Sequence, residues 1–145
     1  MFEIRIERVI GKSIDTVFDI FSDYEGYKRF ASVKNAKIME PGETERNGRG
    51  ALRHVDLGMI KFDERITCFE RPYRLDYKIV KSSPIPIRHK GGTITLIEEG
   101  DATKVVWVSR GTIAIPIIGS LLDGFFERQG NRAFGGLLKQ ISKLG

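Results

Sequence analysis

Cysteine and histidine, the residues that most often build metal centres and crosslinks, are scarce in this sequence. The single cysteine, Cys68, cannot form an internal disulfide or a cysteine-based metal site. The two histidines, His54 and His89, stand in no metal-binding arrangement. Catalytic motifs are missing as well, because no G-x-S-x-G, phosphate-loop or carboxylate-pair pattern occurs. We therefore expect no metal and no other cofactor.

Long apolar runs, repeats and linkers are also absent. No segment approaches the roughly 18 apolar residues of a membrane span, and the start, MFEIRIER, alternates charged with apolar residues, unlike a signal peptide. Nothing in the composition marks a boundary between two domains. We expect residues 1–145 to form a single domain with one core, and a cytoplasmic location is the default expectation.

The positive charge is modest and dispersed. A net charge of +5 favours anionic partners, but lysine and arginine are mixed with acids, and only short basic clusters occur, at 46–53 and 88–90. The sequence motifs of nucleic-acid-binding folds are missing. We therefore expect a mixed-charge surface and no nucleic-acid partner.

What the sequence does contain is a clear change of hydrophobic period. Residues 2–10 alternate as a strand does, Ser13 can cap a helix that follows, and a second short helix is expected at 23–30. Further strands, separated by turn residues, are expected at 33–40, 49–57, 59–69, 73–81, 91–98 and 103–113. From 117 to 144 apolar residues recur at helical spacing, which predicts one long amphipathic helix lying across the inner face of an antiparallel sheet.

That helix contains four glycines, at 124, 130, 135 and 136. Each one weakens a helix, so they suggest close backbone approach, a bend, or unfilled space beneath the helix. Equally, the helix could end near Gly135-Gly136.

One charged residue interrupts an apolar strand face. Residues 60–69, IKFDERITCF, alternate between polar and apolar except at Glu64. On the apolar face an ionised carboxylate must be paired, hydrogen-bonded or neutralised.

The turn at 57–58 predicts its partner. With two residues in that turn, Arg53 lies opposite Phe62 and diagonal to Glu64 on the inner face, within reach for an ion pair. A register shifted by one residue would turn His54 inward in place of Arg53, and a turn of three or four residues is also compatible. The same alternation turns Tyr77 and Trp107 inward.

Two interpretations of this polar cluster remain open. The Arg53–Glu64 pair ties two strands of a dry core, which is tolerated when its hydrogen bonds are complete. Alternatively, helix and sheet stand apart, and the polar groups orient a ligand in a mainly apolar cavity.

Three motifs, taken in order, carry a resemblance to a known family. They are SIDTVFDIFSDYEGYKRF, the run GRGALRHVDLG followed by DERITCFERPYRLDYKIV, and GDATKVVWV. With the order of elements, they resemble the START-like (SRPBCC) superfamily over the whole chain, and most closely its bacterial and archaeal branch similar to abscisic-acid receptors. The resemblance implies an α+β helix-grip fold, with a curved antiparallel sheet of about seven strands wrapped around the long C-terminal helix and two short helices after the first strand.

The resemblance also implies a site. In that branch the acid and the arginine matched by Glu64 and Arg53 point into a ligand cavity, and loops matched by 56–58 and 82–89 close over it. The first loop lacks the proline of the receptor gate, and the lysine that grips the hormone is matched by Ser32. Abscisic acid is therefore not the expected ligand.

The expected function is binding of a small hydrophobic molecule, such as a lipid, isoprenoid or polyketide, that carries a polar head group. The alternative is a polyketide cyclase/dehydrase or isomerase that uses Glu64 as its acid/base. An adjacent arginine keeps Glu64 ionised and makes it a poorer proton donor, which favours binding. A third class, an interaction protein without a ligand, requires a cavity filled by side chains. The predicted ligand-binding residues are Arg53, Glu64, Tyr77, Trp107, Phe125, Phe126 and Gln129.

Residues 111–122, GTIAIPIIGSLL, form an apolar segment too short to span a bilayer. It suits a lid or a transient contact with a membrane surface, to which anionic lipid would attract the positive charge. Alternatively, it only seats the start of the helix.

Overall fold

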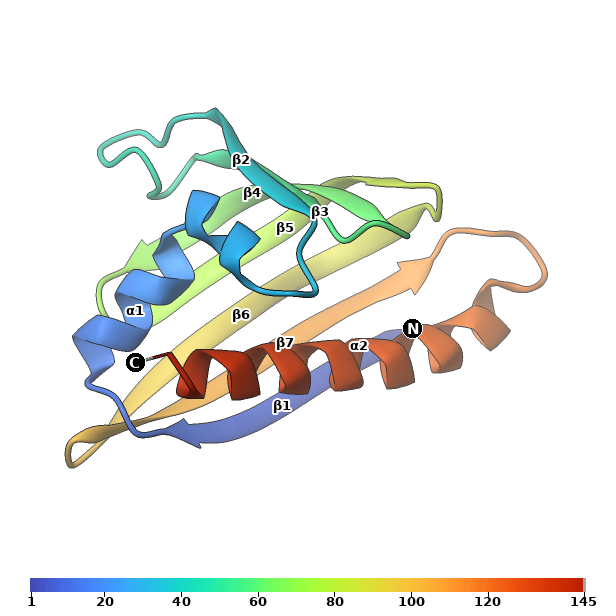
Figure 1. Ribbon diagram of the computed structural model, residues 1–145. Coiled ribbons are helices and arrows are strands. Elements are labelled where there is room, and N and C mark those ends of the chain that lie inside the picture. Colours follow the sequence, from blue (N-terminus) through green and yellow to red (C-terminus); the bar gives the residue numbers. More distant parts are fainter. Residues whose placement is uncertain (145) are drawn as a thin grey trace.

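The computed structural model describes residues 1–144, which form one curved sheet gripping a long helix (Figure 1). The elements in chain order are β1 (Phe2–Ile10), α1 (Ile14–Ser22), the 3-10 helix η1 (Glu25–Arg29), β2 (Asn35–Glu40), β3 (Leu52–Asp56), β4 (Lys61–Glu70), β5 (Arg74–Ser83), β6 (Ile87–Glu99), β7 (Ala102–Ile113) and α2 (Gly119–Ser142). All strand pairs are antiparallel. The predicted helix-grip fold is confirmed.

The strand order is β1-β7-β6-β5-β4-β3-β2, so the meander from β2 to β7 is closed by the first strand pairing with the last. Helix α2 lies across the sheet along β1 and β7, and α1 covers the other end (Figure 1). The loops β3–β4, β5–β6 and β7–α2 gather at one end of the molecule, the right-hand end of Figure 1. No helix within residues 1–144 has the length and apolar character needed to cross a bilayer.

Local signals in the sequence explain the short helices and the core. The Ser13 side chain accepts a hydrogen bond from the Thr16 amide at 3.3 Å, as expected of an N-cap. The apolar face of α1 then meets the inner face of the sheet and the last turns of α2. The core residues that these three elements share include Val17, Phe18, Phe21, Ile66, Leu75, Ile94, Leu96, Val105, Leu138 and Ile141.

The β3–β4 turn differs from the two-residue turn considered above. Asp56 pairs with Lys61, so four residues form the loop, and Arg53 lies opposite Glu64 rather than opposite Phe62. The register has moved by two residues, which keeps every side chain on its predicted face because the strand period is two. Arg53 is therefore buried, whereas His54 turns outward and contacts Asp63, with 2.6 Å between Nδ1 and Oδ1.

Strand β6 begins four residues earlier than predicted. Its pairing with β7 continues through an irregularity between His89 and Gly91, where Gly91 has a φ of 131°. Because only glycine adopts that conformation readily, alternation in the sequence breaks there although the strand does not.

The sheet opens between β5 and β6 toward the loop end. These two strands pair only over Arg74–Tyr77 and Gly92–Thr95. Beyond that ladder the amide of Ile79 donates instead to His89 Nδ1 at 2.9 Å. A side chain thus satisfies a strand amide that has no cross-strand carbonyl.

Helix α2 continues without a break through Gly135-Gly136, so an end at that point is wrong. Gly130 has a packing role, because an added Cβ would lie 2.2 Å from Cδ1 of Ile4 on β1. Gly136 meets nothing within 4 Å. Close approach and open space therefore both occur along this helix.

A polar stripe on α2 fastens the helix to the edge of the sheet. Asp123 accepts from the Ile113 amide at 2.8 Å, Glu127 from the Glu3 amide at 2.9 Å, and Asn131 from the Arg5 amide at 3.0 Å. Since Glu3 and Arg5 lie on the edge strand β1, two of these bonds satisfy amides that would otherwise be open to another chain, and the third satisfies an amide at the end of β7.

Candidate functional site

A cavity of about 220 Å³ lies between the inner face of the sheet and α2. Its walls are mainly apolar, with side chains from β1, β4, β6 and α2 that include Ile4, Phe62, Ile94, Phe134 and Leu137. The polar residues that reach it are Tyr27, Ser32, Arg53, Glu64, Tyr77, Ser109 and Gln129. The predicted cavity is thus present, and it is not filled by side chains.

The Arg53–Glu64 ion pair forms one polar wall. The two residues are cross-strand partners, and Arg53 Nε lies 2.9 Å from Glu64 Oε1. Arg53 Nη1 also donates to the Tyr27 hydroxyl at 3.2 Å, and Tyr27 in turn donates to the Phe21 carbonyl. Both members of the pair are buried, so each charge depends on the other for compensation.

Three tyrosine rings surround the guanidinium. Its central carbon lies 4.7 Å from the ring centre of Tyr24, 5.0 Å from that of Tyr77 and 5.6 Å from that of Tyr27. Aromatic faces attract a cation, so Arg53 is stabilised on the side away from the carboxylate. Glu64 is free to present its second oxygen elsewhere.

Burial and charge determine the protonation of this cluster. Burial opposes the cation, but the combined attraction of Glu64 and the surrounding tyrosines outweighs it, and the net effect raises the pKa of Arg53. Burial raises the pKa of Tyr27, and burial with the nearby Glu64 charge raises the pKa of Tyr77. Arg53 is therefore a cation and the tyrosines are neutral phenols at neutral pH.

A second hydrogen-bonded chain reaches the cavity from β5, β6 and β7. Trp107 Nε1 donates to the Tyr77 hydroxyl at 3.0 Å. His89 Nδ1 accepts from the Ile79 amide, so its proton is on Nε2, which donates to Ser109 Oγ at 2.8 Å. Burial, with the charge of Lys78, lowers the pKa of His89 to about 4, so this histidine is neutral at pH 7.

The Tyr77 ring is held by a glycine. Gly92 is its cross-strand partner, and a Cβ at Gly92 would lie 2.2 Å from Cζ of the ring. The missing side chain lets the tyrosine lie flat against β6. Since Trp107 occupies one lone pair of the Tyr77 oxygen, the phenolic proton stays available for another acceptor.

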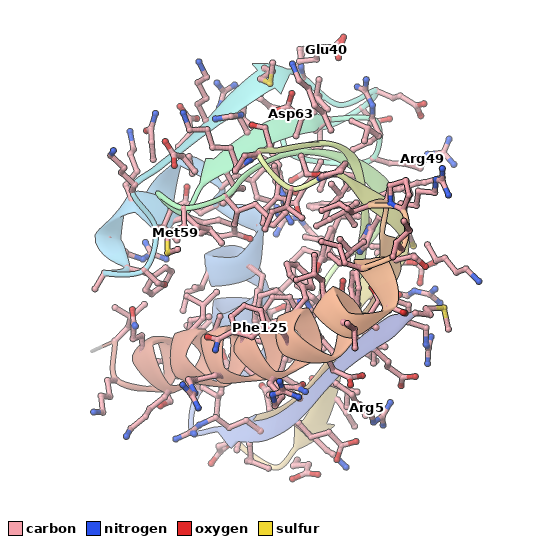
Figure 2. All side chains as sticks on the ribbon, turned by 90° about the vertical axis from the view of Figure 1, so that its right-hand side faces the viewer. Arg5, Glu40, Arg49, Met59, Asp63 and Phe125 are labelled. Carbon is pink, nitrogen blue, oxygen red and sulfur yellow. The ribbon has the colours of Figure 1, made fainter. Side chains whose placement is uncertain are left out.

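The mouth of the cavity lies beside α2. Gln129 and Ala133 line the cavity but are also exposed to solvent, and Ser32, Leu57 and Ile60 line it from the opposite side. Figure 2 views this end of the molecule and shows Met59, at the tip of the β3–β4 loop, above α2. A ligand can therefore enter between that loop and the helix.

The structure brings together most of the residues predicted from sequence. Those that line the cavity are Arg53, Glu64, Tyr77, Trp107, Phe126 and Gln129. Phe125 is a correction, because it does not line the cavity and its side chain is 54% exposed on the outside of α2 (Figure 2). Phe126 is rotated by about 100° from Phe125 around the helix axis, and it is Phe126 that lines the cavity.

Sequence reasoning missed Tyr24, Tyr27, His89 and Ser109. The two tyrosines lie in the short helical segment after α1, where the sequence carries no periodic signal that shows which side chains turn inward. His89 lies at the irregularity in β6, outside the strand that alternation predicted. Within residues 1–144, no three His, Cys, Asp or Glu side chains cluster as metal ligands would.

Solved structures share this architecture. A START superfamily protein from Mycobacterium smegmatis superposes with a TM-score of 0.79 at 12% identity, over 100% of both chains. A protein from Thermus thermophilus gives 0.78 at 22% identity, over 97% of this chain and 94% of that one. The Zhui aromatase/cyclase from a Streptomyces species gives 0.71 at 13%, over 97% and 93%. At sequence identities this low, the structural similarity shows a common fold and does not by itself show a common function.

No curated protein sequence shows significant similarity to this chain. The family described as "Polyketide cyclase / dehydrase and lipid transport", however, matches residues 1–144. Because this match spans almost the whole chain, the chain belongs to the polyketide cyclase/dehydrase and lipid transport family.

Proposed function

We propose that this protein binds a small, mainly apolar molecule that carries a polar group, and holds it between the sheet and α2. The observation that carries the proposal is the unfilled cavity of about 220 Å³, whose apolar walls are interrupted by a few convergent polar groups. Such cavities are typical of small-molecule sites. The family description, which includes lipid transport, supports the same class of function.

The size of the cavity limits the ligand. Pockets that enclose drug-sized ligands usually measure about 300–1,000 Å³, which is larger than the space here. We therefore expect either a compact molecule or one whose tail extends past Gln129 and Ala133 through the mouth.

The polar groups define what the ligand head must offer. Glu64, paired with Arg53, accepts hydrogen bonds, whereas the neutral Tyr77 hydroxyl can donate one. The pairing of Glu64 with Ile79 and of Ile66 with Tyr77 places these two side chains diagonally on one sheet face. A hydroxyl group, which both donates and accepts, is the simplest head group that satisfies both.

The alternative function is a cyclase, dehydrase or isomerase that uses Glu64 as its acid/base. The Zhui aromatase/cyclase has the same fold, so the fold is compatible with an enzyme of this class. We favour binding because Glu64 is engaged by Arg53 at 2.9 Å, and because the one nearby imidazole, His89, uses both nitrogens on Ile79 and Ser109. Both nitrogens of His89 are thus occupied, and one oxygen of Glu64 is held by the Arg53 guanidinium.

Trp107 provides a built-in reporter for the test. It is the only tryptophan in the sequence, lines the cavity and stacks on Phe134, with ring centres 3.9 Å apart. Titration with 1-anilinonaphthalene-8-sulfonate, an aromatic probe with a polar group, should quench Trp107 fluorescence by energy transfer. Ala133→Phe, at the mouth, should weaken probe binding at least about tenfold by occupying the entrance.

Lys139→Phe is the matched control, because Lys139 is exposed on the same helix and does not line the cavity. It should bind the probe as the wild type does. Equal affinities for all three proteins would contradict a cavity site. Native mass spectrometry of the purified protein should then identify any natural ligand that is retained.

A further inference from the structure

An exposed stripe runs along the outer face of α2 and has no role in the cavity. Its members follow the helical three- and four-residue spacing, and all are exposed: Ile118, Leu121, Phe125, Arg128, Arg132, Gly136 and Lys139. The first two turns of the stripe are apolar, and the later turns carry the cations Arg128, Arg132 and Lys139. We call this set, together with Ile117, the α2 outer stripe.

The apolar part of the stripe is unusually exposed. Leu121 is 77% exposed and Phe125 is 54% exposed, whereas Leu122 and Phe126 on the inner face of the same helix pack against the core. The inner apolar residues therefore already hold α2 on the sheet. Burial within the chain does not account for the outer ones.

Ile117 adds an independent sign of function. Its side chain is 97% exposed, and its φ is 74°, in the left-handed region that disfavours β-branched residues. The Ile118 amide bonds to the Pro116 carbonyl at 2.9 Å, which closes a tight turn with Ile117 at its tip. Strain that holds an apolar side chain in solvent is typical of recognition sites.

The cationic part faces solvent without acidic neighbours on its own helix face. The two acids of α2, Asp123 and Glu127, lie on the other side and bond to the amides of Ile113 and Glu3. Within residues 1–144, Arg128, Arg132 and Lys139 form no ion pair. The stripe therefore presents uncompensated positive charge along about 16 Å of helix.

We propose that the α2 outer stripe docks the protein on an anionic lipid bilayer. A bilayer interface places apolar carbon directly beneath a negatively charged surface, which matches apolar side chains followed by cations on one helix face. The stripe overlaps the segment 111–122 expected from sequence at Ile117, Ile118 and Leu121, whereas 111–113 belong to β7. Docking in this way brings the cavity mouth, at Gln129 and Ala133, beside the lipid.

Co-sedimentation with vesicles tests the proposal. Wild-type protein should bind vesicles of phosphatidylcholine mixed with phosphatidylglycerol, and bind vesicles of phosphatidylcholine alone much more weakly. Since each cation near an anionic surface contributes about fivefold, Arg128→Gln with Arg132→Gln should lower partitioning roughly 25-fold. Leu121→Ser with Phe125→Ser should lower it by at least about tenfold.

Matched controls come from exposed residues outside the stripe, Val80→Ser for the apolar change and Lys34→Gln with Lys37→Gln for the charge change. These should partition as the wild type does, and all variants should keep the wild-type melting temperature. Wild type that does not sediment with anionic vesicles, or stripe variants that bind as the controls do, would overturn the proposal.

The alternative partner for the apolar part of the stripe is a second copy of the chain. Sedimentation velocity without lipid distinguishes membrane docking from self-association. If the wild type is a dimer and the Leu121→Ser, Phe125→Ser variant is a monomer, the stripe is a self-association surface and the membrane proposal is overturned. The test of vesicle binding is independent of the test of ligand binding in the cavity. Stripe variants should bind 1-anilinonaphthalene-8-sulfonate normally, whereas Ala133→Phe should lose the probe and bind anionic vesicles at least as strongly as the wild type does.

Discussion

At the scale of single residues, a few polar side chains in an apolar cavity define the site. Arg53 pairs with Glu64, donates a hydrogen bond to the Tyr27 hydroxyl, and lies against the faces of three tyrosine rings. This arrangement decides what a substitution of Glu64 should do. An orphaned arginine would keep its aromatic neighbours and the adjoining cavity, into which water can enter.

Glu64→Gln should therefore cost little stability and more affinity. The amide oxygen can still accept from Arg53 Nε, so we expect a loss of only about 1 kcal/mol in the free energy of unfolding. Affinity for a ligand with a hydroxyl head should fall by about 1–3 kcal/mol, because a charged acceptor is replaced by a neutral one. Urea unfolding and ligand titration measure the two effects.

Two further variants make this prediction decisive. Glu64→Leu removes the acceptor altogether and leaves Arg53 to its aromatic neighbours and to water, so it should cost more than Glu64→Gln but less than the roughly 3–5 kcal/mol of a dry buried pair. Glu99→Gln, at the exposed end of β6, is the control and should change stability by less than about 1 kcal/mol. A loss above about 3 kcal/mol for Glu64→Gln would show that the pair is a dry structural contact.

His89 predicts how stability depends on pH. Because burial lowers its folded pKa to about 4, its contribution is complete above the unfolded value and is lost as pH falls toward 4. Between an unfolded pKa of about 6.5 and the folded value, the loss should reach about 3 kcal/mol. Protonation would also remove the acceptor of the Ile79 amide.

Urea unfolding of wild type and His89→Gln between pH 7 and pH 4 measures this loss. Glutamine cannot take up the proton, so the difference between the two proteins should shrink steadily as the solution becomes more acidic. Parallel pH profiles would contradict this role for His89.

At the scale of elements, α2 is both a wall of the cavity and a cover for the sheet edge. Its side chains satisfy amides on β1 and β7, and its glycines differ in what surrounds them. Gly130 lies against Ile4, whereas Gly136 faces open space. The same substitution should therefore have opposite effects at these two positions.

Gly136→Ala should raise the free energy of unfolding by about 0.5–1 kcal/mol, because alanine favours the helix and meets no neighbour. Gly130→Ala should lower it by about 1–3 kcal/mol, because the added methyl group collides with a buried isoleucine that must turn into the cavity. Thermal and urea unfolding of the two variants test this contrast. Stabilisation by both substitutions would show that Ile4 repacks freely.

At the scale of the whole molecule, one end is open and the other is closed. The loops β3–β4, β5–β6 and β7–α2 gather at the open end, and the β5–β6 ladder stops short of it (Figure 1). The cavity mouth lies at this end, beside exposed apolar side chains such as Met59. Conformational change on binding should therefore be confined to it.

Amide hydrogen exchange with and without 1-anilinonaphthalene-8-sulfonate should show this localisation. We expect the probe to slow exchange by about tenfold or more in residues 57–62 and 129–137, and to leave the β6–β7 turn unchanged. Ala133→Phe should abolish the protection. Protection restricted to residues 117–125 would instead place the probe on the α2 outer stripe.

The sequence by itself determined the elements and the face of each strand. Alternation in the strands, the cap at Ser13 and the long amphipathic period of α2 are local signals, because they depend only on neighbouring residues along the chain. Arg53, Glu64, Tyr77 and Trp107 turned inward as predicted even though the β3–β4 register moved by two residues, since such a shift preserves strand parity.

Only the tertiary structure decided which side chains meet across the cavity. The tyrosines around Arg53 come from η1 and β5, and His89 replaces a strand carbonyl where the sheet opens, neither of which any local pattern encodes. Phe125 faces outward rather than inward because the rotation of α2 is set by Asp123, Glu127 and Asn131 bonding to the sheet edge. Side-chain contacts between distant segments depend on how elements are rotated and spaced, and packing of the whole chain fixes both.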